Sequence, residues 1–205
     1  MMMTKAELDL IVPLQYRRRN NGFTRTLGRL LLGISGWRII GALPDVPKVV
    51  VIVAPHTSAW DFVVGVAALF ALDIRIAFLA KHTLFTGMLG RFIRAIGGIA
   101  VERTKPNGVV ADAVSAITAA ERMVFALAPE GTRKLDRGFK TGFLHIAQGA
   151  KVPICLAYFD FEKKVVGFGK LITPSGDVPH DMERIIDFYQ PIRGRYRKVW
   201  QNDAE

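Results

Sequence analysis

Short apolar runs alternate along this chain with longer stretches in which apolar residues recur every three or four positions. The short runs are nearly continuous, as in strands covered on both faces of a sheet, and the longer stretches have the period of helices. Strands are expected at residues 49–54, 75–79, 99–101, 123–128 and 152–159, and a further strand is a candidate at residues 165–169. Helices are expected at residues 60–72, 85–96, 109–122, 139–149 and 182–189.

Strands that alternate with helices predict crossover connections, and hence an α/β fold with a mostly parallel sheet flanked by helices. The chain has 205 residues, of which 50% are hydrophobic. This size and composition suit a single domain with one substantial core.

An additional helix is predicted at residues 23–40, ahead of the first strand. Its apolar residues recur at spacings of three and four, arginines lie among them, and three more arginines precede it at residues 17–19. Such an amphipathic basic helix either packs its apolar face on the core or lies in the interface of a membrane, and both can hold in part. We therefore divide the chain into a basic N-terminal segment, residues 1–44, and a main domain, residues 45–205.

The charge balance predicts an anionic partner. Lys and Arg number 28 and Asp and Glu number 18, which gives a net charge of +10. Nucleic acid and an anionic membrane both attract such a chain. Most aromatic residues lie in apolar runs rather than among the basic residues, which favours the membrane and argues against nucleic acid.

The apolar windows are shorter than the roughly 20 residues that span a bilayer, so contact at the membrane surface is expected. The first 20 residues lack the apolar core of a secretion signal. We expect a cytoplasmic protein that is peripherally associated with the cytoplasmic face of a membrane. The single cysteine, Cys155, lies in an apolar run, where a core role is expected rather than a nucleophilic or zinc-binding one.

The first candidate for chemistry is the pair His56 and Asp61, which follows the strand at residues 49–54. In one continuous helix this spacing would leave the two side chains about 140° apart. They meet only if the chain turns at Thr57 and Ser58, either of which could be the N-cap of the next helix. A carboxylate that accepts one ring N–H of a histidine leaves the other nitrogen to act as a base. The alternative is that both residues serve only as structural caps.

The second candidate is the run Glu130, Gly131, Thr132 and Arg133, directly after the strand at residues 123–128. Gly131 permits an unusual turn and the close approach of a ligand, while Thr132 and Arg133 offer donors to an anionic oxygen. The alternative is an ordinary polar turn with a solvated arginine.

Three more cations follow predicted strands or turns: Lys81, Arg103 and Lys140. Arg103 ends a glycine-rich strand segment, and each of the three is a candidate phosphate contact. The alternative for each is a solvated surface residue in a loop.

These blocks together resemble the lysophosphatidate (1-acyl-glycerol-3-phosphate) acyltransferase family, within the glycerolipid acyltransferases. The family's block of His, four residues and Asp is matched by His56 and Asp61, and its glycine-rich strand ending in arginine by residues 98–103. Its Glu-Gly-Thr-Arg block is matched at residues 130–133 and is followed by Phe-Lys-x-Gly at residues 139–142. Its last block, Val-Pro-Ile-x-Pro, begins at Val152, but Leu156 stands where the family has proline.

The resemblance implies that His56 and Asp61 form a catalytic dyad within a catalytic domain at residues 45–205. It implies a fatty acyl donor, either acyl-CoA or acyl carrier protein. We expect no cofactor, and although His56, Asp61 and Glu130 are residue types that bind divalent ions, their spacing does not demand a metal. The acceptor implied is a lysophospholipid, 1-acyl-glycerol-3-phosphate first, in phospholipid biosynthesis. The residues expected to contact substrate are Lys81, Arg103, Glu130, Gly131, Thr132, Arg133 and Lys140.

Two alternatives stay open: an acyltransferase for a different lyso-lipid, and a peripheral lipid-binding protein without turnover. Leu156 places the expected difference from the family in the substrate pocket rather than in the dyad.

Overall fold

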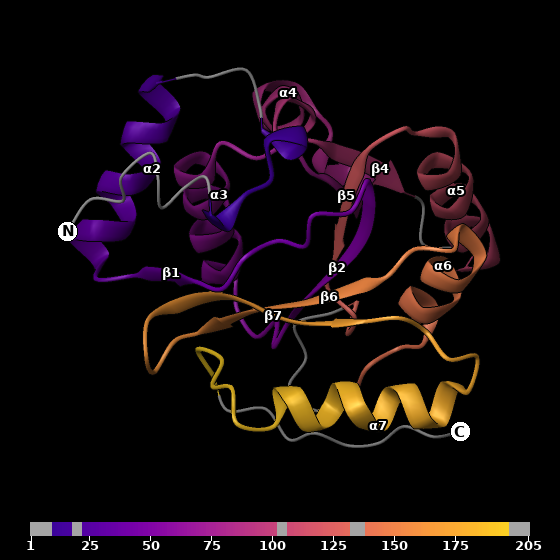
Figure 1. Cartoon of the computed structure of the whole chain (residues 1–205). Coiled ribbons are helices and arrows are strands. Elements are labelled where there is room, and N and C mark those ends of the chain that lie inside the picture. Colours follow the sequence, from indigo (N-terminus) through magenta and orange to yellow (C-terminus); the bar gives the residue numbers. More distant parts are fainter. Residues whose placement is uncertain (1–9, 18–21, 102–105, 132–137, 197–205) are drawn as a thin grey trace.

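The computed structural model describes residues 10–17, 22–101, 106–131 and 138–196. It contains one sheet of seven strands in the order β1-β7-β6-β2-β5-β3-β4, with helices on both faces (Figure 1). The strands are β1 (Arg38–Ile40), β2 (Lys48–Ala54), β3 (Ala77–Lys81), β4 (Gly98–Val101), β5 (Met123–Leu127), β6 (Ile154–Asp160) and β7 (Val165–Ile172). The helices are α2 (Gly22–Ser35), α3 (Trp60–Leu72), α4 (Gly87–Ala95), α5 (Pro106–Ala119), α6 (Gly142–Ala150) and α7 (Val178–Tyr189), with short 3-10 turns η1 (Leu14–Tyr16) and η2 (His82–Leu84).

The sheet is mostly parallel. β2 pairs in parallel with β5 and β6, and β3 pairs in parallel with β4 and β5. β7 is antiparallel to β6, and β1 runs parallel to β7. The predicted α/β class with a mostly parallel sheet is therefore confirmed. It follows that the carboxyl ends of β2 to β6 lie along one edge of the sheet, where open α/β sheets bind their ligands.

Alternate residues of β2 enter two different cores. Val50, Ile52 and Ala54 pack with side chains of α5, α6 and α7 on one face of the sheet. Val49 and Val51 pack on the other face with Leu72, Ile74 and residues of the N-terminal segment. Burial on both faces explains why the strands appear in the sequence as continuous apolar runs.

The predicted helix at residues 23–40 is wrong beyond Ser35. Gly36 adopts a φ of +76°, a left-handed conformation that ends helices. The chain then forms β1, whose residues pair with the start of β7. Trp37 lies edge-on to Phe161, with ring centroids 4.9 Å apart. The apolar periodicity continues past the helix end because Trp37 and Ile39 pack against the core cluster that contains Val166 of β7.

Other element bounds shift by a few residues. α5 begins at Pro106 and α6 at Gly142, in each case three residues from the predicted start. α7 begins at Val178 because the Asp177 carboxylate accepts the His180 N–H as N-cap, with a proline in the first turn. The candidate strand at residues 165–169 is confirmed and extends to Ile172 as β7.

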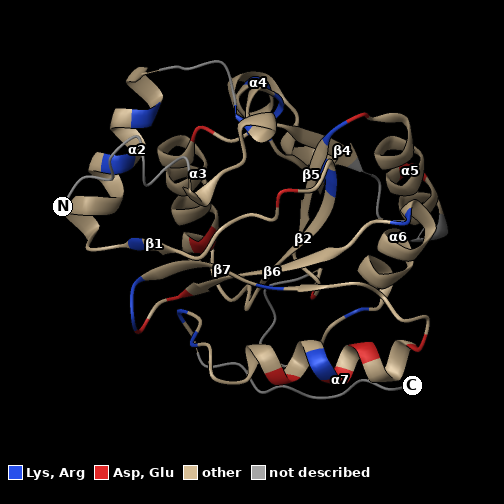
Figure 2. Cartoon of the chain, in the orientation of Figure 1, with Lys and Arg blue, Asp and Glu red and all other residues tan. Residues whose placement is uncertain are grey.

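Helix α2 packs tightly on α3. A Cβ on Gly28 would lie 2.4 Å from the Ala71 nitrogen and 2.6 Å from the Ala67 oxygen, so only glycine permits this approach. Gly28 and Leu32 are the buried residues of α2. The helix carries arginines and no acidic residue (Figure 2). Within the described parts of the chain, no helix has the length and apolar character required to cross a bilayer.

Tyr189, at the end of α7, ties this helix to the centre of the sheet. Its side chain is fully buried, and its hydroxyl lies 2.9 Å from the main-chain oxygens of both Ile52 on β2 and Ala157 on β6. Burial raises the pKa of the phenol well above its ordinary value, so the hydroxyl keeps its proton and remains a donor. The contact holds the strand that leads to His56 beside its neighbour.

We expect Tyr189→Phe to lower the free energy of unfolding by about 1–3 kcal/mol, because buried carbonyl oxygens lose a donor. Chemical denaturation followed by circular dichroism measures the change. Tyr158→Phe is the matched control, since the hydroxyl of Tyr158 has no hydrogen-bond partner among the described residues. Equal stability of the two variants would contradict the role assigned to Tyr189.

Candidate active site

His56 and Asp61 meet at the carboxyl end of β2. The strand ends at Ala54, and the chain turns before α3 begins at Trp60. The turn brings His56 Nδ1 to 3.0 Å from Asp61 Oδ2. The Asp61 side chain is 1% exposed, whereas that of His56 is 29% exposed. The imidazole is therefore reachable from solvent while the carboxylate behind it is not.

The Asp61 carboxylate is held by the same turn. Its Oδ2 accepts the main-chain N–H groups of Thr57 at 2.8 Å and Ser58 at 2.9 Å, and its Oδ1 accepts the Ser58 hydroxyl at 3.2 Å. A buried carboxylate needs such donors, because leaving it unpaired in the interior is costly. These contacts fix the orientation of Asp61 and, through it, that of the His56 ring.

The sequence predicts Thr57 or Ser58 as the N-cap of α3, and the structure differs. Ala59 occupies the N-cap position, and its side chain makes no capping bond. Ser58 Oγ instead accepts the Trp60 N–H at 3.1 Å from one position earlier. The reason is that the Ser58 hydroxyl also donates to Asp61, which draws it toward the carboxylate.

This geometry suits a base. The Nδ1–H of His56 points to Asp61, which fixes the tautomer and leaves Nε2 with a lone pair. The carboxylate also stabilises the imidazolium that forms when Nε2 takes a proton. The pair can thus accept a proton from a bound hydroxyl and later return it to a leaving group.

Glu130 supports the dyad from the neighbouring strand. It follows β5, is 0% exposed, and its Oε1 accepts the main-chain N–H of His56 at 2.9 Å. The sequence suggested that Glu130 contacts substrate. The structure places its carboxylate against the backbone of His56, where it fixes the position from which the imidazole projects.

Gly131 and Lys140 lie next to Glu130. Gly131 has a φ of +62°, a conformation that favours glycine, and its N–H donates to Ala128 O at 3.1 Å. The Lys140 N–H donates to Pro129 O at 3.0 Å, which joins the two loop segments. The exposed Lys140 side chain runs alongside Gly131, since a Cβ there would lie 3.8 Å from Lys140 Cδ and Cε.

The other predicted contacts lie farther away or outside the described chain. Lys81 ends β3 and is exposed at the same edge of the sheet. β5 separates β3 from β2, so Lys81 is two strands, about 10 Å, from the end of β2. Arg103, Thr132 and Arg133 lie outside the described residues.

Sequence reasoning missed a contact between Tyr196, at the end of the described chain, and the loop after β2 that carries His56. The Tyr196 N–H donates to Thr57 Oγ1 at 3.3 Å. The run of basic residues after α7 is visible in the sequence, but no local pattern indicates that it returns to the loop after β2. The supporting donors at Thr57 and Ser58 were also missed, because their main-chain groups carry no sequence signal.

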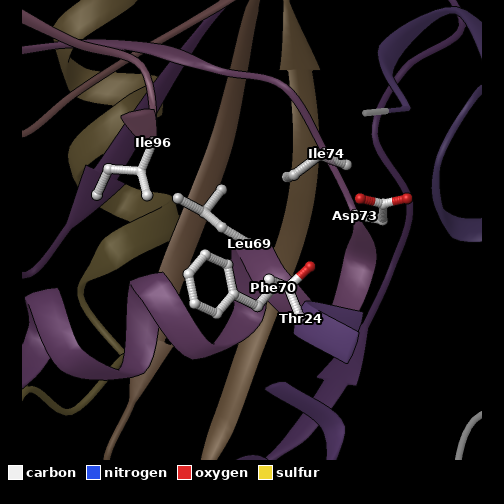
Figure 3. Close-up of a pocket in the computed structure, with 6 residues that line it drawn as sticks. All are labelled: Thr24, Leu69, Phe70, Asp73, Ile74 and Ile96. Carbon is white, nitrogen blue, oxygen red and sulfur yellow. The ribbon is translucent and has the colours of Figure 1, made fainter. Parts of the chain in front are cut away.

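A small crevice lies where α2, α3 and the end of α4 meet (Figure 3). Its lining includes Asp73, twelve residues after Asp61 along α3. That separation corresponds to about 18 Å of helix, so the crevice lies at the far end of α3 from the dyad. In the described ranges, no three His, Cys, Asp or Glu side chains gather as a metal site.

Cys155 and Leu156 are both core residues of β6. Cys155 is 1% exposed on the face that carries Val49 and Val51, and burial raises its pKa to about 12. Leu156 is 0% exposed on the opposite face, among side chains of α6 and α7. The departure from the family's proline therefore lies inside the core.

Comparisons with known proteins identify the family of the chain and a solved structure with a similar fold. The sequence model of the family described as Acyltransferase matches residues 43–159, more than half of the 205 residues. The fold is similar to that of the 1-acyl-sn-glycerophosphate (LPA) acyltransferase PlsC from Thermotoga maritima. The TM-score is 0.58 and the sequence identity 18%, over 86% of this chain and 81% of that chain. No curated protein matches the chain significantly.

We expect the thiol of Cys155 to resist iodoacetamide at pH 8 in the folded protein. An ordinary thiol with a pKa near 8.5 is partly ionised there, whereas a buried thiol with a pKa of about 12 is almost wholly neutral. Intact mass before and after alkylation measures the reaction, and protein unfolded in guanidinium is the positive control. Rapid labelling of the folded protein would show that the thiol is accessible and reactive.

Proposed function

This chain belongs to the acyltransferase family, and we propose that it transfers a fatty acyl chain from a thioester to the hydroxyl of a lysophospholipid-like acceptor. The observation that carries the proposal is the 3.0 Å contact between His56 Nδ1 and the buried Asp61, which leaves the other nitrogen of a partly exposed imidazole to act as base. In this proposal residues 45–205 supply the chemistry, and residues 1–44 supply part of the membrane contact.

The proposed reaction needs no enzyme nucleophile. His56 Nε2 removes the proton of the acceptor hydroxyl as its oxygen attacks the thioester carbonyl, and Asp61 stabilises the resulting imidazolium. Collapse of the tetrahedral intermediate breaks the carbon–sulfur bond, and the thiolate takes the proton back from His56. The products are the new ester and a free thiol.

We propose 1-acyl-glycerol-3-phosphate as the first acceptor to test, as a step of phospholipid biosynthesis, with acyl-CoA or acyl carrier protein as donor. The name of the T. maritima protein and the sequence motifs support this choice. Lys140 beside Gly131 is a cation close to the loop that supports His56, which suits a phosphate-bearing acceptor. Lys81, Arg103, Thr132 and Arg133 are the further phosphate contacts in this proposal.

The exposed side of α2 supports a membrane contact. Gly28 and Leu32 face α3, yet Phe23 and Ile34 are 77% and 79% exposed, and Leu30 and Leu31 are about half exposed. These residues form an outward apolar stripe on a helix without acidic residues, as in helices that lie in a membrane interface. Packing on the domain and contact with a membrane are thus compatible for α2, because each uses a different face of the helix.

A second apolar stripe lies on η2 and α4. Met88 is 85% exposed, and Leu84, Leu89 and Phe92 are each about half exposed, with arginines on the same helix. Anionic headgroups would attract the arginines while the apolar side chains enter the lipid. We therefore propose peripheral attachment to an anionic membrane on its cytoplasmic face, which brings the lipid substrates to the base.

We expect His56→Ala to lower the rate of acyl transfer by about 10²- to 10⁴-fold while the protein stays folded, because the base is removed. The assay supplies acyl-CoA or acyl carrier protein with a panel of lyso-lipids and identifies products by mass. His145→Ala is the matched control, because that histidine is exposed on α6 and lies outside the site.

An unchanged rate in His56→Ala would refute the mechanism. Lipid binding by the wild-type protein with no product from any donor and acceptor would favour the peripheral lipid-binding alternative. Transfer only to a lyso-lipid other than 1-acyl-glycerol-3-phosphate would correct the acceptor and leave the dyad in place.

We expect the double variant Phe23→Ser with Ile34→Ser to bind anionic phosphatidylglycerol vesicles at least about tenfold more weakly, because two large apolar side chains no longer enter the lipid. Vesicle co-sedimentation measures the partition coefficient. Leu171→Ser removes an apolar side chain of 47% exposure on β7 and is the control. Equal binding by both variants would place the membrane contact elsewhere.

A further inference from the structure

The chain that leaves α7 returns to the carboxyl edge of the sheet. Ile192 is 8% exposed and belongs to the same core as Tyr189. The Phe161 N–H, just after β6, donates to Arg193 O at 2.8 Å. These contacts anchor the segment at residues 192–196 beside the end of β6, next to the turn that follows β2.

Gly194 lies directly against this turn. A Cβ at Gly194 would be 2.8 Å from both Oγ1 and Cγ2 of Thr57 and 3.1 Å from Pro55 Cγ. Tyr196 adds a hydrogen bond from its N–H to Thr57 Oγ1. Because the Thr57 N–H itself donates to Asp61, the segment is one residue removed from the dyad.

Arg195, between these two contacts, lies over the side chain of Trp60, the first residue of α3. Its guanidinium carbon lies 5.2 Å from the ring centroid of Trp60, the residue directly before Asp61. Both side chains are exposed, Trp60 at 53%. A guanidinium stacked on an indole is held in place by the ring, while the N–H donors at its edge stay available to a planar or tetrahedral anion.

Arg195 also differs from the cations that form ion pairs with buried carboxylates. Lys163 and Arg184 pair with the buried Asp160 and Asp181. In the parts of the chain that the structure describes, no carboxylate pairs with Arg195. Its guanidinium thus lies against an aromatic ring beside the site, and no carboxylate of the described residues neutralises its charge.

We propose that Arg195 is a substrate-binding residue that holds a phosphate group of a substrate at the rim of the His56 site. The inference rests on the proposed function, in which acceptor and donor both carry phosphate: a monoester on the lysophosphatidate, and phosphates on coenzyme A or on the carrier protein's prosthetic arm. Arginine binds phosphate through paired N–H donors. The residue lies beyond the part of the chain that matches the family, residues 43–159.

The test compares Arg195→Gln and Arg195→Lys with the wild-type chain. We expect Arg195→Gln to raise the KM of one phosphate-bearing substrate by about tenfold or more, because a charged hydrogen bond is lost. Arg195→Lys should recover part of the affinity, and the pH profile of kcat should not move. Lys170→Gln removes the same charge near the end of β7, which pairs with the amino end of β6, and is the control.

Phosphate-free substrates identify the source of the phosphate. If Arg195 binds the acceptor, wild type and Arg195→Gln should have equal KM values when the acceptor is a monoacylglycerol. If Arg195 binds the donor, the two proteins should have equal KM values when the donor is an acyl-pantetheine. A difference that persists when both substrates lack phosphate would overturn the proposal and make Arg195 a structural residue.

A binding measurement without turnover separates this inference from the proposed function. Calorimetric titration with inorganic phosphate and with coenzyme A should show weaker binding by Arg195→Gln for at least one of these probes. If Arg195→Gln binds a probe more weakly but the wild-type protein transfers no acyl chain, the proposed function is refuted and Arg195 remains a phosphate-binding residue. Equal affinity for both probes, together with equal KM values, would overturn the inference while acyl transfer stands.

Discussion

The candidate site depends on the hydrogen bonds that the buried carboxylate of Asp61 accepts. A negative charge at 1% exposure is tolerable only with several donors around it, and the turn after β2 supplies two N–H groups, a hydroxyl and the ring of His56. The contacts that make this turn stable are therefore the contacts that orient the imidazole. Local stability and the proposed chemistry share one set of hydrogen bonds.

Segments far apart in the sequence support this turn from different sides. Glu130 holds the backbone of His56, and the segment with Gly194 and Tyr196 packs on Thr57. They converge because β5 and β6 are the parallel neighbours of β2, so their carboxyl ends lie beside His56. Tyr189 bonds to oxygens of β2 and β6, which links the start of the C-terminal segment to the same strands.

The N-terminal helix shows how one element serves both packing and exposure. The absence of a side chain at Gly28 lets α2 approach α3 closely, so a narrow face is enough to attach the helix. The larger apolar side chains Phe23, Leu30, Leu31 and Ile34 then remain exposed on the outer face of the helix. In the proposed function this outer face contacts the lipid, and no large enclosed cavity is required because the acyl chains can remain partly in the membrane.

The sequence by itself determined the class of fold and identified His56 and Asp61 as the candidate pair for chemistry. Continuous apolar runs indicate strands buried on both faces, and the spacing of His56 and Asp61 requires a turn between strand and helix. Periodicity is a local signal, however, and could not show that the helix stops at Gly36 and that β1 follows it. Only the tertiary structure decided that Glu130 faces the backbone of His56 and that Arg195 lies over Trp60. Those contacts depend on strand order and on the return of the chain after α7, which are set by long-range packing rather than by neighbouring residues.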